Sequence, residues 1–129
     1  VDEADETVCW PMTGSGEIDI FEHHSDGGPD HYAARAIKSL GYCGGGDWQA
    51  LMLVQEASLD QFHEYSVEWD EKHIAFRLDG AEIYSSPDPH DQFPEPLFAI
   101  LNFAKINDSP MIGGDWVMEI DWVKHEARQ

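Results

Sequence analysis

Large apolar side chains recur at every second position within residues 65–69 and again within residues 74–78. A period of two residues is typical of a strand that buries one face. Asp79-Gly80, directly after the second stretch, is a strong signal for a two-residue hairpin turn. We therefore expect an antiparallel meander in this part of the chain.

Other stretches also predict strands. Residues 49–55 are apolar and strand-like, residues 97–104 are almost continuously apolar, and residues 115–126 alternate again. Residues 32–42 are ambiguous, because helix-forming residues stand between neighbours that favour a strand. No segment of useful length shows the helical period. The sequence therefore predicts one all-β domain over residues 1–129, an antiparallel β-sandwich.

Acidic residues occupy a predicted strand that leaves a glycine-rich turn at residues 14–16. Because side chains alternate between the two faces of a strand, Glu17 and Asp19 share one face, and Ile18 and Ile20 share the other.

Glu22 has the opposite parity. A single β-bulge near Ile20 and Phe21 would correct this, since one extra residue turns every later side chain to the other face. Glu17, Asp19 and Glu22 would then line one surface, with an apolar layer behind it.

Three carboxylates on one strand face repel one another and need an explanation. One interpretation is a solvated acidic face, which an acidic chain can tolerate. The other is a pair of carboxylates that hydrolyses a glycosidic bond, one as nucleophile and one as general acid and base. In the second interpretation Asp19, between the outer two, raises the pKa of the carboxyl that carries the proton.

The overall charge narrows the possible partners. The chain holds 26 acidic and 7 basic residues, a net charge of -19. This charge argues against nucleic acid, anionic membranes and sulfated polysaccharides, and it favours a neutral substrate. Salt would screen the self-repulsion, so we expect a salt-rich, halophilic habitat. No apolar run approaches the roughly 18 residues of a membrane span.

Two cysteines, Cys9 and Cys43, leave two alternatives. They form one disulfide in an exported protein, or they are two buried free thiols. No signal peptide is found at Val1, so we expect a mature secreted chain or a segment of a longer one.

Trp10-Pro11 followed by Gly16-Glu17-Ile18-Asp19-Ile20-Phe21-Glu22 resembles the signature of glycoside hydrolase family 16. The E-x-D-x-x-E spacing is similar to that of the laminarinase-like branch, whereas E-x-D-x-E is found in the lichenase-like branch. Residues 62–80 and 101–124 also resemble family segments, in the same order and with similar separation.

The resemblance implies a concanavalin A-like jelly roll, a concave sheet that binds an extended polysaccharide, and net retention of anomeric configuration. By position, Glu17 would be the nucleophile, Glu22 the acid and base, and Asp19 the residue that tunes them. We expect an endo-acting enzyme that cleaves β-1,3-glucan or mixed β-1,3/1,4-glucan. The alternative is a non-catalytic β-glucan-binding module on the same fold.

Further candidates lie outside the acidic strand. Trp10 would stack on a sugar ring, or else lie in the core. Asn102, the lone polar residue in its apolar run, needs a backbone or sugar hydroxyl partner. His63, in the meander, is a third candidate for substrate binding. Asp121 stands where relatives often place a calcium ligand, so a structural calcium ion is possible, and no other cofactor is expected.

The resemblance covers only the later part of a typical family domain. The strands that normally precede the catalytic strand are missing, so we expect a sandwich truncated on its N-terminal side, with unpaired edges. A homo-oligomer would cover such edges. Lys38 stands where many relatives carry a histidine that contacts sugar.

Overall fold

The computed structural model describes residues 16–23, 30–39, 48–70, 73–87, 97–103 and 117–127. The chain divides into two compact units, Val1–Leu97 and Phe98–Gln129. Every element of secondary structure among the described residues is a β-strand, which confirms the all-β class. None of these residues belongs to a helix long and apolar enough to cross a membrane.

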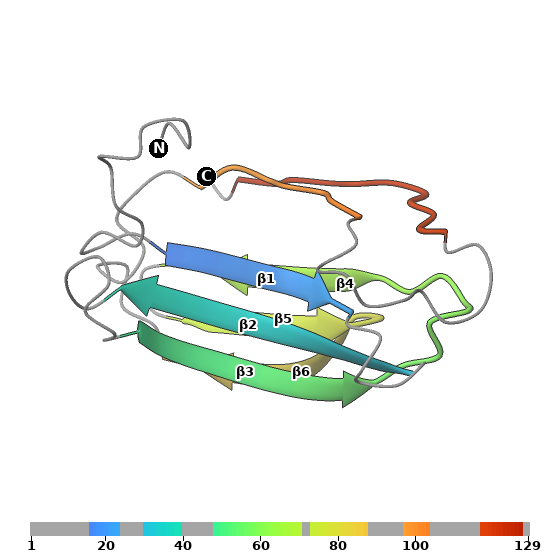
Figure 1. Ribbon diagram of the computed structural model, residues 1–129. Helices are drawn as coiled ribbons and strands as arrows, with labels where there is room; N and C mark the ends of the chain where they lie inside the picture. Colours follow the sequence, from blue (N-terminus) through green and yellow to red (C-terminus); the bar gives the residue numbers. More distant parts are fainter. Residues whose placement is uncertain are drawn as a thin grey trace, which may run out of the picture. The chain divides into compact units, whose positions relative to one another are not determined.

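The first unit contains two antiparallel sheets of three strands each. The first sheet consists of β1 (Gly16–Glu22), β2 (His31–Ser39) and β3 (Trp48–Glu56), with β2 in the middle (Figure 1). This order follows the chain, so each strand pairs with its neighbour in sequence.

β2 resolves the ambiguous stretch at residues 32–42. It pairs with β3 without interruption from His31, opposite Glu56, to Ser39, opposite Trp48. It also pairs with β1 on its other edge. Pairing on both sides satisfies the backbone donors and acceptors, and this outweighs the helix preference of the alanines in the segment.

The second sheet is the predicted meander: β4 (Tyr65–Trp69), β5 (Ile74–Leu78) and β6 (Ala81–Ser86). Asp79 and Gly80 join β5 to β6 with φ angles of 51° and 77°. Two consecutive positive φ angles are the mark of a type I′ turn, whose twist matches that of the strands it connects. The hairpin prediction is confirmed.

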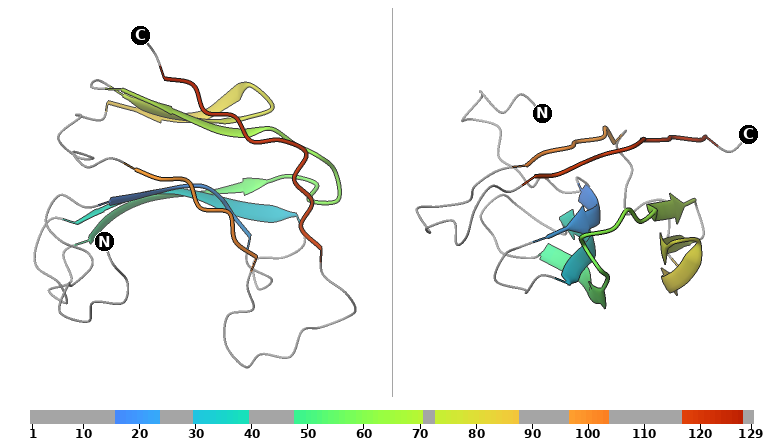
Figure 2. Two further views of the ribbon diagram at one scale, coloured as in Figure 1. Left: turned by 90° about the horizontal axis from the view of Figure 1, so that it is seen from above. Right: turned by 90° about the vertical axis from the view of Figure 1, so that its right-hand side faces the viewer.

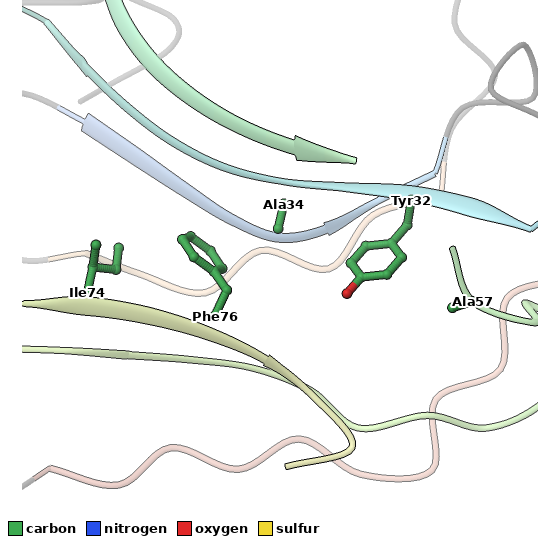
Figure 3. Packing of buried hydrophobic residues seen from close by; sticks show 5 residues of the cluster. All are labelled: Tyr32, Ala34, Ala57, Ile74 and Phe76. Atoms are coloured by element: carbon green, nitrogen blue, oxygen red, sulfur yellow. The ribbon is translucent and has the colours of Figure 1, made fainter. Parts of the chain in front are cut away.

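The two sheets pack face to face in the first unit and form the core between them (Figure 2). Figure 3 shows Tyr32 and Ala34 of β2 opposite Ile74 and Phe76 of β5, with Ala57 at one end. Phe76 is only 1% exposed. Since a buried Phe is worth about 3 to 5 kcal/mol relative to Ala, this ring is a main link between the sheets.

The described segments after residue 96 depart from the sequence prediction. Residues 97–103 and 117–127 contain no strand, although strands were expected over 97–104 and 115–126. Most large apolar side chains of these segments are exposed. A segment that is apolar, or that alternates apolar and polar residues, becomes a strand only where another strand pairs with it. None of the described strands pairs with either segment.

Candidate active site

The pairing of β1 with β2 is interrupted after Asp19. Asp19 lies opposite Arg35, and Glu22 lies opposite Ala33, so three steps along β1 match two along β2. This extra residue is the predicted β-bulge, which the structure confirms. Because of the bulge, Glu22 returns to the face that Glu17 and Asp19 share. The three acids therefore line one face of the first sheet.

The opposite face of β1 is apolar but differs from the prediction in one residue. Ile18 and Phe21 pack against the core, whereas Ile20 is 40% exposed. Ile20 was expected in the apolar layer, and this was wrong because the bulge gives Phe21 the inward position. The Phe21 ring centroid lies 5.4 Å from that of Tyr32 and 4.6 Å from that of Tyr65. These contacts hold Phe21 inward and so favour an outward position for the next residue.

Asp19 is the half-buried centre of the acidic face. Among the described residues its Oδ2 atom has no hydrogen-bond partner. Burial, then a hydrogen bond with Glu17, then the charges of Glu17 and Glu22 raise the pKa of Asp19 from 3.8 to about 7, against the opposing effect of Arg35. The sequence suggested that Asp19 would raise the pKa of a neighbour. In the structure the raised pKa belongs to Asp19, which retains its proton through the acidic range.

Arg35 is the site residue that the sequence analysis missed. Its Nε atom lies 2.9 Å from Oε2 of Glu22, and the two side chains are 30% and 28% exposed. The available signal was a charged residue inside a stretch of small apolar residues on the neighbouring strand. Only the pairing register shows that this cation lies beside the acids.

His63 is held by groups outside the acidic face. Its Nδ1 atom lies 2.7 Å from Oδ2 of Asp79, and its Nε2 atom lies 3.2 Å from the carbonyl oxygen of Ser58. Both partners are oxygen atoms, one from a carboxyl group and one from a backbone carbonyl. The ring also contacts Tyr65 of β4, which packs against the core. These contacts join the chain before β4 to the hairpin, and they lend no support to a sugar-binding role.

The other predicted site residues lie in the second unit or outside the described residues. Asn102 and Asp121 are exposed and belong to the second unit. Trp10, Cys9 and Cys43 lie outside the described residues, as does the side chain of Lys38, which stands where many relatives carry a histidine.

Calcium takes six to eight oxygen ligands. No group of three or more His, Cys, Asp or Glu side chains in the described part of the chain could hold a metal ion. The calcium ion expected at Asp121 remains a prediction.

Comparison with protein families matches residues 9–126 to glycosyl hydrolases family 16. The match contains β1 with all three acids, both sheets of the first unit and most of the second unit. Comparisons with curated proteins and with solved structures gave no match.

Proposed function

Since this chain belongs to glycosyl hydrolase family 16, whose fold is a jelly-roll sandwich, we propose that it is a retaining endo-glycosidase. Its substrate is β-1,3-glucan of the laminarin type or mixed β-1,3/1,4-glucan, as in the laminarinase-like branch. The observation that carries this proposal is the bulge in β1, which brings Glu17, Asp19 and Glu22 to one face of the sheet.

In the proposed reaction the two outer acids have different roles. A carboxylate oxygen of Glu17 attacks the anomeric carbon, the bond to the leaving sugar breaks, and Glu22 gives its proton to the departing oxygen. Glu22, now ionised, then takes a proton from water. The water oxygen attacks the same carbon and releases Glu17 as a carboxylate, so two inversions give net retention. The carboxyl groups of retaining enzymes lie about 5 to 5.5 Å apart.

Asp19 keeps the total negative charge of the three acids low. With a pKa raised to about 7, it is largely protonated below neutral pH and shares its proton with Glu17. Its O–H stabilises the negative charge of the nucleophile without adding a third negative charge.

The charge of the whole protein agrees with a neutral polymer as substrate. At a net charge of -19, the surface repels sulfated or carboxylated polysaccharides, while an uncharged glucan meets no such barrier. We also propose that the enzyme is secreted, that it works at high salt, and that Asp121 binds a structural calcium ion. A homo-oligomer is a separate prediction, and light scattering at high salt tests it.

The direct test is hydrolysis by Glu17→Gln and Glu22→Gln, measured as reducing ends from laminarin, lichenan, agarose and carrageenan. We expect the wild type to act on the first two polymers only. Glu17→Gln should have no turnover, and Glu22→Gln should lose about 100- to 10,000-fold, the usual contribution of general acid–base catalysis. Glu82→Gln, on β6 of the other sheet, is the matched control and should keep full activity.

Circular dichroism must show that each variant is folded. Normal activity of Glu17→Gln on laminarin would contradict the assigned role. Laminarin binding by the wild type without release of reducing ends would instead assign the chain as a glucan-binding module.

A further inference from the structure

The bulge in β1 contributes one ring to a group of three aromatic rings in the core, each from a different strand. The ring centroid of Phe21 on β1 lies 5.4 Å from that of Tyr32 on β2 and 4.6 Å from that of Tyr65 on β4. The centroids of Tyr32 and Tyr65 lie 4.9 Å apart, so each ring contacts the other two. Figure 3 shows the Tyr32 ring projecting from β2 into the space between the sheets. We call these three rings the aromatic triad.

The rings of the aromatic triad are arranged as favourable pairs. Phe21 and Tyr32 are stacked with an angle of 22° between their planes, and Tyr32 and Tyr65 meet edge to face at 73°. Pairs at such distances contribute stabilisation beyond the area that they bury. Tyr65 is the member from the second sheet, so it links β1 to β4 across the core.

Hydrogen bonds fix the chain directly before Tyr65, the first residue of β4. The backbone N–H of Glu64 donates to Oδ1 of Asp79 at 2.9 Å, and the backbone N–H of Asp79 donates to the carbonyl oxygen of Glu64 at 2.8 Å. Nδ1 of His63 lies 2.7 Å from Oδ2 of the same aspartate, and the His63 ring lies 6.0 Å from the Tyr65 ring. The hairpin turn therefore holds the Tyr65 ring at a fixed place, against which Phe21 packs.

The bulge has two residues that could face the core. Ile20 and Phe21 both stand between Asp19 and Glu22, and the bulge requires that one of them point inward and the other outward. In the structure Phe21 packs against the core and Ile20 is 40% exposed. If Ile20 were inward, the Phe21 ring would lie on the acidic face, and the backbone between the two acids would take another path.

We propose that Tyr65 is a positioning residue for the two carboxyls that flank the bulge: its ring holds Phe21 inward and thereby fixes Asp19 and Glu22 in one arrangement. The inference rests on the proposed function, in which Glu22 is the acid and base. Tyr65 contacts the core side of the bulge, whereas the acids lie on the opposite face, so it acts on them through β1. Small movements matter there, since a displacement of about 1 Å at a catalytic group costs about 100-fold in rate.

The experiment measures kcat and KM on laminarin for the wild type, Tyr65→Leu and Tyr65→Phe. We expect Tyr65→Leu to lower kcat by about 10- to 100-fold, because the acids are no longer held in one arrangement. KM should change by less than about threefold, since substrate contacts away from the bulge are kept. Tyr65→Phe keeps the ring and should keep the wild-type kcat.

Tyr84→Leu is the matched control. Tyr84 belongs to the same sheet and packs against the same core, but it lies on β6, and β5 separates this strand from β4. The substitution removes the same side-chain atoms as Tyr65→Leu. It should lower the urea midpoint of unfolding as Tyr65→Leu does, while kcat stays at the wild-type value.

A double-variant cycle tests whether Tyr65 acts through Phe21. Phe21→Leu removes the ring that Tyr65 holds, so Tyr65→Leu should lower kcat no further when it is added to Phe21→Leu. Two independent effects would instead multiply. Circular dichroism must show that each variant is folded.

The inference is overturned by an unchanged kcat in folded Tyr65→Leu, by a similar loss in Tyr65→Phe or in Tyr84→Leu, or by effects that multiply in the double variant. If Tyr65→Leu does not fold, Tyr65→Met takes its place, and if the double variant does not fold, the single variants decide. A wild-type chain that releases no reducing ends refutes the proposed function and this inference with it. An active wild type with an unchanged kcat in Tyr65→Leu refutes only the role of Tyr65.

Discussion

Deletion of Ile20 tests the bulge. In the β1–β2 register, Asp19 is opposite Arg35 and Glu22 is opposite Ala33, with one residue too many between the two acids on β1. Removing Ile20 leaves all these pairs in place and makes β1 regular. The three acids still share one face, and Phe21 still faces the core.

The energetic cost follows from the exposure of the deleted side chain. Ile20 is 40% exposed, so it buries somewhat more than half of its surface. Full burial of an Ile is worth about 1.5 to 3 kcal/mol, so the deletion removes about 1 to 2 kcal/mol. The regular ladder then gains the backbone hydrogen bonds that the bulge disrupts. We expect the free energy of unfolding to change by no more than about 2 kcal/mol.

Activity on laminarin should also survive. Removing the bulge changes the local twist, and a displacement of about 1 Å at a catalytic group costs about 100-fold. We therefore expect the deletion variant to lose no more than about 100-fold in kcat/KM while remaining well above background.

Two further deletions serve as controls. Deleting Phe21 keeps the parity of the acids but puts Ile20 in the inward position and removes two ring contacts. Each such contact is worth about 0.5 to 1.5 kcal/mol, so urea unfolding should show an additional loss of about 1 to 3 kcal/mol. Deleting both Ile20 and Phe21 brings Glu22 opposite Ala34, which is 1% exposed in the core. That variant should be inactive and strongly destabilised, because a buried carboxylate without a partner is costly.

A folded Ile20 deletion variant with no activity would refute the parity argument, and so would an active double deletion. The assay combines reducing ends from laminarin with urea unfolding followed by tryptophan fluorescence.

Two predictions concern pH and stability. Asp19 keeps its proton to about pH 7 in the folded state, whereas the unfolded carboxyl releases it near 3.8, so the wild type loses stability as the pH rises through this interval. Asp19→Asn should therefore gain Tm relative to wild type between pH 4 and pH 8, and a pH-independent difference would contradict this. A hydrogen bond from the Glu64 N–H, and then His63, lower the pKa of Asp79 below 3.8. The stabilisation that the Asp79 carboxylate adds to the folded state is present above about pH 4 and is lost as the pH falls below that value. Asn tolerates the positive φ at this position. Asp79→Asn should therefore lower Tm at pH 6 and match the wild type near pH 2. An equal deficit at both pH values would refute this role.

The sequence was sufficient to predict the bulge. The parity of Glu22 conflicted with that of the two preceding acids, and one extra residue was the simplest solution. It could not show whether Ile20 or Phe21 faces the core, because that depends on Tyr32 and Tyr65, which come from other strands.

Arg35 was missed for a similar reason. Its position beside Glu22 depends on the pairing register of β1 with β2, and several residues separate the two strands in sequence. The meander was predictable because local alternation and the turn at Asp79-Gly80 agree. The apolar run at 97–104 has no such local signal for its pairing partner, so its composition alone led to a wrong prediction there.

The most direct test of the central claim is the anomeric configuration of the first product released from laminarin, followed by proton NMR during the first minutes of reaction. A retaining enzyme with Glu17 as nucleophile and Glu22 as acid and base gives the β-anomer first, with the α-anomer appearing later by mutarotation. The result predicted here is an initial β-anomer signal that is absent in Glu17→Gln. An initial α-anomer, or an undiminished signal in that variant, would contradict the account.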